Sequence, residues 1–303
     1  MSSDKTTTEA EAADNCCASC GIAEVDDIKL VPCDTCDLAR YCCNECQRDH
    51  RSEHEVKCKE RAAELRDEIL FRQPEGTHLG DCPICCLPFS LYTQKSKMQS
   101  CCSKLICVGC SYSNIERQLE QNMQRTCPFC RQPVPKSQDE RKMNEMKRVE
   151  ANDPVAIRQV GFMHYDKGDY DGAFKYWMKA ADFGDAIAHY ELSVMYLDEE
   201  GVEKDEKKEI YHLEEAAIAG HPSARYNLAC CEEYSGRIDR AVKHYIIAAN
   251  LGEDNSIQDL KECYKDGHVS KDDFAAALRG HYAAVEATKS PEREVGAKYY
   301  AAL

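Results

Sequence analysis

The sequence predicts a mainly α-helical protein in which two small zinc fingers precede a helical solenoid. Eighteen of the 21 cysteines lie before Arg131, and most of these recur as Cys-x-x-Cys pairs. Such a turn places two thiolates within reach of one ion, and four ligands complete a tetrahedral zinc site. After residue 151 a short motif of small residues ending in glycine recurs after 36 and then 32 residues. A period in the thirties is typical of stacked helical repeats.

Composition and charge narrow the classes of function. The net charge is −15, yet residues 82–133 carry six Lys or Arg against two Asp or Glu, whereas residues 152–303 carry 18 against 29. The acidic repeats disfavour nucleic-acid binding, because phosphate contacts need a basic surface. No stretch approaches the roughly 18 apolar residues of a membrane span.

The polar residues at the start of the sequence indicate the cellular compartment. Residues 1–15 are polar, and we expect them to form a disordered tail without the apolar run of a signal peptide. We therefore expect a cytoplasmic or nuclear protein. In such reducing surroundings, dense cysteines serve as metal ligands rather than as disulfides.

The first cysteine cluster, in residues 16–60, contains ligands for two zinc ions. Seven suitably spaced cysteines and one histidine form four pairs: Cys17/Cys20, Cys33/Cys36, Cys42/Cys46 and His54/Cys58. The last two pairs have the four-residue step that places side chains on one face of a helix. His50 competes with His54 as the ligand, and the spacing to Cys58 favours His54.

This cluster resembles the MYND zinc finger, above all in the run from Arg40 to Gln47 and in the His54-x-x-x-Cys58 ending. The resemblance implies interleaved ligands, with Cys17, Cys20, Cys42 and Cys46 on one zinc and Cys33, Cys36, His54 and Cys58 on the other. Several MYND fingers bind proline-rich peptides through a glutamine and a tryptophan. Gln47 matches the glutamine, but Arg51 occupies the tryptophan position.

A helix and linker over residues 61–80 lead to the second cysteine cluster, in residues 81–134. The linker contains the helix breaker Gln73–Gly76 and a lone histidine, His78, which we expect at the surface. The second cluster has four pairs of cysteines: Cys82/Cys85, Cys101/Cys102, Cys107/Cys110 and Cys127/Cys130. Eight cysteines in this order indicate two further zinc sites.

The second cluster resembles a RING finger of the all-cysteine type. That resemblance implies one site of Cys82, Cys85, Cys107 and Cys110 and another of Cys101, Cys102, Cys127 and Cys130. Most RING fingers have a spacer between the third and fourth ligands and often a histidine there, whereas Cys101 and Cys102 are adjacent. Lys104 falls where that histidine would be if Cys102 were the third ligand, and lysine is not a usual zinc ligand. We therefore expect both cysteines to bind.

A RING finger that acts as an E3 ubiquitin ligase docks a ubiquitin-charged E2 and holds it in a reactive pose, so its contribution is positioning. The residues that match the family's contact positions for E2 and ubiquitin are Ile84, Pro128 and Arg131. The usual tryptophan, four residues after the sixth ligand, is replaced by Asn114. Tyr112 and Ile115 are the available substitutes.

The rest of the sequence is predicted to form helices. In the linker 135–151, Met143, Met146 and Val149 recur at three-residue steps, as on a helix with one narrow apolar stripe. Beyond it, the recurring motifs end in Gly184, Gly220 and Gly252, where glycine suits the left-handed end of a helix. A large residue expected in the core precedes each glycine by seven positions: Trp177, Leu213 and Tyr245.

These motifs resemble Sel1-like repeats, which are relatives of the tetratricopeptide repeat, and they extend over residues 152–288. Three units are clear, at about 152–184, 185–220 and 221–252, and a degenerate fourth follows at 253–288. Residues 289–303 are expected to form a frayed C-terminal tail.

Together these features predict a zinc-binding, multi-module protein-interaction protein with about four Zn²⁺ ions. The specific hypothesis is a RING-type E3 ubiquitin ligase whose second finger recruits an E2 while the repeats or the MYND finger hold the substrate. The alternatives are a non-enzymatic scaffold or adaptor and a MYND-dependent transcriptional regulator. The expected partners are proteins, and neither nucleic acid nor a membrane is expected. No GxSxG, phosphate-binding GxxxxGK or HExxH motif occurs.

Overall fold

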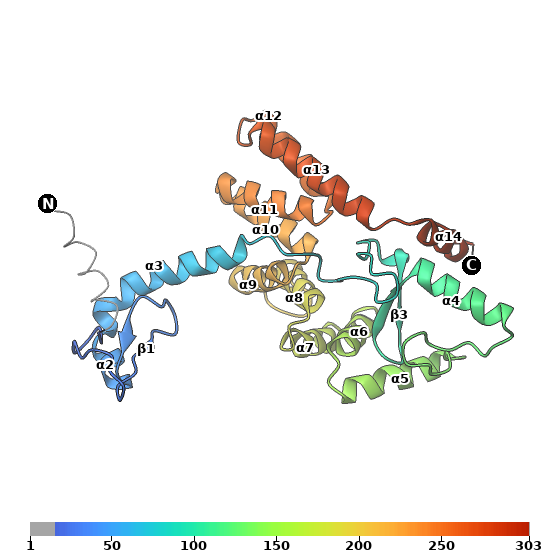
Figure 1. Cartoon of the computed structure of the whole chain (residues 1–303), viewed down its shortest axis with the longest axis horizontal. Coiled ribbons are helices and arrows are strands. Elements are labelled where there is room, and N and C mark those ends of the chain that lie inside the picture. Colours follow the sequence, from blue (N-terminus) through green and yellow to red (C-terminus); the bar gives the residue numbers. More distant parts are fainter. Residues whose placement is uncertain (1–15, 303) are drawn as a thin grey trace. The chain divides into compact units, whose positions relative to one another are not determined.

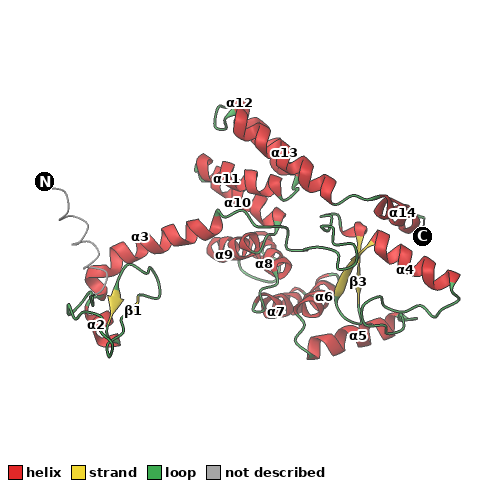
Figure 2. Cartoon of the chain, in the orientation of Figure 1, coloured by secondary structure: helices red, strands yellow, loops and turns green. Residues whose placement is uncertain are grey.

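The computed structural model describes residues 16–302, which belong to two compact units with a boundary between Arg72 and Gln73 (Figure 1). The expected disordered tail, residues 1–15, lies outside the described residues. Helices dominate, and the only named strands of the described part form two short hairpins (Figure 2). Among the described helices, none is long and apolar enough to cross a membrane.

The first unit is a small finger followed by one long helix. Strands β1 (Val31–Pro32) and β2 (Arg40–Tyr41) pair antiparallel, and helices α2 (Asn44–Asp49) and α3 (Arg51–Leu70) follow. Apart from cysteines, the buried cluster of the finger consists of three apolar residues, Leu30, Ala39 and Tyr41. So small a core does not hold a fold alone, and bound metal supplies the missing stability.

The second unit begins with another finger. The 3₁₀ helix η1 (Thr93–Lys95) precedes β3 (Ser96–Gln99), which pairs antiparallel with β4 (Lys104–Cys107), and helix α4 (Val108–Glu120) follows directly. The hairpin turn carries Cys101 and Cys102, and Ser103 after them has a φ of 55°. This finger also has a small apolar core, in which the buried residues other than cysteine are Phe89, Ile106, Val108 and Ile115.

The repeats form four successive helical hairpins, which confirms the prediction of a mainly α-helical solenoid. The helices, from linker to last repeat, are α5 (Gln138–Glu150), α6 (Pro154–Tyr165), α7 (Tyr170–Ala181), α8 (Ala186–Asp198), α9 (Glu206–Ile218), α10 (Pro222–Tyr234), α11 (Ile238–Asn250), α12 (Asp254–Lys265) and α13 (Lys271–Ala287). The three predicted core residues Trp177, Leu213 and Tyr245 are each 1% exposed. In the linker helix α5, only Val149 is buried, while Met143 and Met146 are exposed.

At each repeat boundary, three or four residues separate the end of one helix from the start of the next. Gly184, Gly220 and Gly252 have φ values of 77°, 84° and 89°, the left-handed conformation expected of them. The residue after the glycine then caps the next helix: the Asp185 carboxylate accepts from the Ala188 amide at 2.8 Å. These local signals, with the alanines packed at the turns, determine where one helical hairpin ends and the next begins.

We expected residues 289–303 to form a frayed tail, but the part that the structure describes, residues 289–302, is mostly helical. Residues Pro291–Ala301 form helix α14, which packs against α4 of the second finger. The helix begins where Ser290 Oγ accepts a hydrogen bond from the Arg293 amide at 3.2 Å and Pro291 occupies its first turn. Arg293 and Gly296 are its buried residues, so a charged residue and a glycine anchor it, and hydrophobic periodicity gives no sign of this contact.

Buried histidines predict that the solenoid loses stability in acid. Burial, followed by neighbouring positive groups, lowers the pKa of His212 to about 4 and that of His244 to about 3. The unfolded chain therefore binds protons below about pH 6.5 that the folded chain does not bind until about pH 4. Above about pH 6.5 neither state binds these protons, and the free energy of unfolding keeps its full value. As the pH falls below this value, the free energy of unfolding decreases by about 1.4 kcal/mol per pH unit for each histidine.

Urea unfolding followed by circular dichroism, from about pH 7 to about pH 5, measures this slope. The variant His212→Gln is the comparison, because glutamine can still hydrogen-bond His189, whose Nδ1 lies 3.0 Å from Nδ1 of His212. We expect the slope to decrease by about one proton in this variant. Equal slopes would contradict the prediction, and acid loss of zinc cancels in the comparison.

Candidate metal centre

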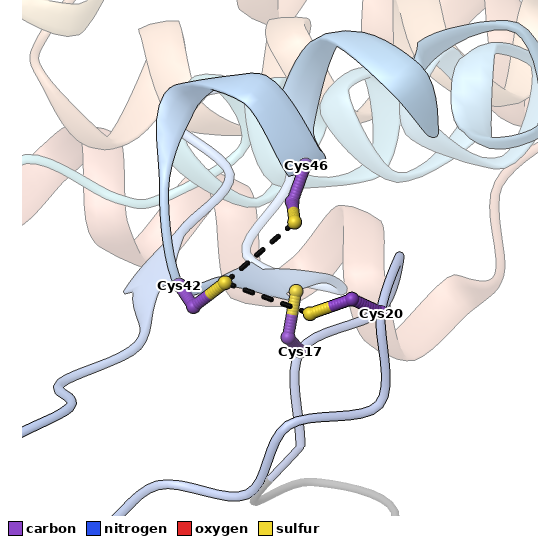
Figure 3. Close-up of side chains that lie close together, drawn as sticks. All are labelled: Cys17, Cys20, Cys42 and Cys46. Carbon is purple, nitrogen blue, oxygen red and sulfur yellow. Dashed lines mark hydrogen bonds between the residues drawn. The ribbon is translucent and has the colours of Figure 1, made fainter.

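The first ligand set combines two segments of the N-terminal finger (Figure 3). Cys17 and Cys20 come from the turn before β1, whereas Cys42 follows β2 and Cys46 lies on α2. The Cys42 sulfur is 3.6 Å from the sulfur of Cys20 and 3.6 Å from that of Cys46. Tetrahedral zinc with bonds of about 2.3 Å requires sulfurs about 3.8 Å apart, so this set fits the ion.

The second set of this finger contains the histidine. The sulfurs of Cys33 and Cys58 are 3.8 Å apart, and Nε2 of His54 lies 3.1 Å from the Cys36 sulfur. His50 instead has Nδ1 at 3.1 Å from the Tyr41 hydroxyl, and its ring stacks on that of His54. The structure therefore places His54 in the ligand set, whereas His50 lies outside the set and packs against His54.

The second finger brings together the other two predicted sets. Cys82, Cys85, Cys107 and Cys110 form one, and Cys101, Cys102, Cys127 and Cys130 form the other. Sulfurs are 3.8 Å apart for Cys85 and Cys107, and 3.8 Å apart for Cys102 and Cys127. The adjacent cysteines both take part, since Cys101 lies 3.3 Å from Cys130. Lys104 points elsewhere, with Nζ 5.5 Å from the centre of the Phe129 ring.

In both fingers the two sites are interleaved along the chain. Each set joins an early pair to a late pair and skips the pair between them, and within every set the donor atoms lie within 4.8 Å of one another. Two ions therefore tie four segments together in each finger, which is a cross-braced arrangement. Four sets of Cys and His donors with zinc spacing provide for about four zinc ions.

Four of the five Cys-x-x-Cys ligand pairs, all except Cys107/Cys110 at the start of α4, share a backbone feature that sequence reasoning missed. The residue after the second cysteine has a positive φ at Gly21 (75°), Asp37 (57°), Cys86 (54°) and Arg131 (60°). In each turn its amide donates to the carbonyl of the first cysteine, at 2.8 to 3.2 Å. The glycine at position 21 was the one available signal. Arg131 thus has a backbone role in its turn, whatever its side chain contacts.

The same turns supply hydrogen bonds that favour thiolates. Burial opposes ionisation of Cys17, but backbone amides, those of Cys20 and Cys42 first, lower its pKa to about 6. Amides likewise outweigh burial at Cys82 and lower its pKa to about 7. In the same finger the pKa of Cys110 is raised, first by burial and then by the neighbouring Cys107 and Cys82, because a second negative charge is costly beside the first. A divalent cation removes this conflict, and bound zinc would hold every cysteine of a set as its thiolate.

Three cysteines of the fingers lie outside all four sets: Cys16, Cys43 and Cys86. A positioning residue that sequence reasoning missed is Gln118 of α4, which is 2% exposed. Its side-chain nitrogen donates to the Thr126 carbonyl and its side-chain oxygen accepts from the Thr126 amide, each at 3.2 Å. These two hydrogen bonds connect α4 to the last Cys-x-x-Cys turn.

Comparison with known proteins identifies the first finger. Residues 17–58 match the family model of the MYND finger, which confirms that resemblance. Among solved structures, a Sel1 repeat protein from Oxalobacter formigenes is similar at 26% identity and a TM-score of 0.38, over 40% of this chain and 97% of that one. A protective antigen with an SLR fold from uropathogenic Escherichia coli strains is similar at 19% identity and a TM-score of 0.39, over 55% of this chain and 37% of that one. A search of the curated proteins found no match.

Proposed function

We propose that this zinc-binding, multi-module interaction protein is a RING-type E3 ubiquitin ligase. The second finger would dock a ubiquitin-charged E2, and the repeats or the MYND finger would hold the substrate. A RING finger takes no covalent part in the transfer, so the geometry of its docking surface is what matters.

The observation that carries the proposal is a cleft beside α4. Ile84, from the turn of one zinc site, and Pro128, from the turn of the other, both line it. Ile84 is 47% exposed, so its side chain is available to a partner. Asn114 and Arg117 of α4 also line the cleft. Two zinc-held turns on either side of one helix form a rigid apolar surface of the kind on which protein partners dock.

The alternative, a non-enzymatic scaffold or adaptor, is favoured by the missing tryptophan. Asn114 stands in its place and its amide donates to the Thr126 carbonyl at 3.4 Å. Neither substitute that the sequence offers is free: Ile115 is 8% exposed, and the Tyr112 ring packs on Tyr299 at 4.8 Å between centroids. The α4 side of the cleft therefore lacks the large apolar group that the docking of an E2 usually uses.

Ubiquitin transfer separates the two functions. The purified protein is incubated with E1, a panel of E2 enzymes, ubiquitin and ATP, and chain formation is followed. We expect Ile84→Ala to reduce chain formation roughly 30-fold, because a central interface residue contributes about 2 kcal/mol. Arg131→Ala should reduce transfer from the docked E2 in the same assay.

The matched control is Ile22→Ala, since Ile22 is similarly exposed, at 45%, beside a Cys-x-x-Cys turn of the other finger. It should leave chain formation unchanged. Absence of chains with every E2 would exclude the ligase and leave the scaffold. Equal chain formation by Ile84→Ala and wild type would show that the E2 does not dock on the surface around Ile84.

A further inference from the structure

We propose that the C-terminal helix α14 is a working part of the second finger, and that Arg293 is a positioning residue for the zinc site of Cys82, Cys85, Cys107 and Cys110. Retention of that one metal ion would then depend on helix α14, which lies far along the chain from these cysteines. This inference concerns metal binding and is independent of ligase activity.

The Arg293 guanidinium reaches into the finger. It is 8% exposed, and Nη2 donates to the Cys85 sulfur at 3.3 Å and to the Leu87 carbonyl at 2.8 Å. Nη1 donates to the Pro88 carbonyl at 2.5 Å and to the Thr288 carbonyl at 2.8 Å. The planar fork of arginine thus holds one metal-binding thiolate and the turn that follows it, a set of contacts that the single ammonium of lysine cannot reproduce.

A close helix crossing brings Arg293 to this place. A Cβ atom on Gly109 would lie 2.7 Å from the Arg293 amide nitrogen, and one on Gly296 would lie 2.4 Å from the Val108 carbonyl oxygen. Both glycines are therefore needed for α14 to lie against the first turn of α4. That turn begins at Cys107 and contains Cys110, so the helix crosses directly over two of the four ligands. At the far end, the hydroxyls of Ser111 and Tyr300 are 2.7 Å apart.

A hydrogen bond to a metal-bound thiolate fixes its direction and withdraws part of its charge. Loss of such an outer partner typically weakens metal affinity about 10-fold to 100-fold. Because Arg293 contacts a ligand of one set, its loss should affect one of about four zinc ions. The contact also explains why a buried cation is tolerated here: the thiolate neutralises it.

The test is release of zinc to a chelator from the full-length chain. Arg293→Met keeps the apolar stem and removes the donors, Arg293→Lys restores one charged donor, and Arg279→Ala replaces an exposed arginine of α13 as the control. In Arg293→Met we expect one equivalent of metal to leave at an about 10-fold to 100-fold lower chelator concentration, with helix content by circular dichroism unchanged. Arg293→Lys should lie between this variant and wild type, and Arg279→Ala should match wild type.

Cobalt(II) in place of zinc adds a direct readout, because the sulfur-to-cobalt charge-transfer bands respond to a hydrogen bond on the thiolate. The bands of one site should shift in Arg293→Met. If that variant loses helix content, Arg293→Lys decides: bands shifted from wild type support the positioning role, and identical bands overturn it. An unchanged release profile together with unchanged bands in a folded Arg293→Met overturns the proposal outright.

Discussion

Replacement of Cys107 by serine is expected to unfold the second finger and to reduce the metal content from about four zinc ions to three or fewer. Cys107 is 1% exposed, ends β4 and caps α4 with its sulfur, which accepts from the Cys110 amide at 3.3 Å. Serine has nearly the same shape but does not bind zinc as a thiolate does. A structural zinc contributes about 10–16 kcal/mol to the folding of small fingers, far more than the few apolar side chains of this core supply.

Metal analysis and thermal unfolding of the purified variant check this result. Cys86→Ser is the matched control, because Cys86 follows the Cys-x-x-Cys turn of the same site, is exposed and belongs to no ligand set. It should keep all of the zinc and the wild-type transition. A Cys107→Ser protein that retains about four zinc ions would show that this ligand set is wrong, and loss of metal from the control would show that cysteine exchange itself disturbs the finger.

The sites could be predicted largely because their signals are local. A Cys-x-x-Cys turn is complete within four residues, and a four-residue step on a helix joins His54 to Cys58. The assignment of pairs of ligands to a common zinc ion could not be predicted from such local signals. It came from resemblance to known fingers, since spacing alone does not say which pairs of cysteines meet. The choice of His54 over His50 rested on one helical turn, and the structure brings His54 to Cys36.

The contacts between the second finger and the repeats could not be predicted, because they depend on residues without periodic pattern. His78 was expected at the surface, yet its ring stacks on that of His221 at 4.3 Å and its amide donates to the Gly220 carbonyl at 3.0 Å. Helix α14 is anchored by Arg293 and Gly296, residue types that sequence reasoning assigns to solvent and to turns. Only the fold places a partner opposite them.

Substitution of Trp177 by alanine is expected to lower the free energy of unfolding of the repeats by about 3–5 kcal/mol, the typical cost of truncating a buried aromatic residue. The indole is 1% exposed and its Nε1 donates to the Arg158 carbonyl at 3.3 Å. It lies against Gly161, where a Cβ would come within 2.4 Å of the ring, so this neighbour has no side chain to fill the cavity that alanine would leave. Urea unfolding measures the loss, and Tyr234→Ala, at a residue 96% exposed, should change it by less than about 0.5 kcal/mol.

Hydrogen exchange then shows which helices lose stability in this variant. The result distinguishes a solenoid from a single cooperative core. In a stack of repeats each unit contacts its neighbours only, so a cavity in one unit weakens that unit and its interfaces first. Protection should therefore fall in α6, α7 and α8, which surround Trp177, and should persist in α11 and α12. Metal content should stay at the wild-type level, because the indole touches no ligand of the four sets. A uniform loss of protection from α6 to α13 would mean that the repeats unfold as one body, and the nearest-neighbour account of their stability would then be wrong.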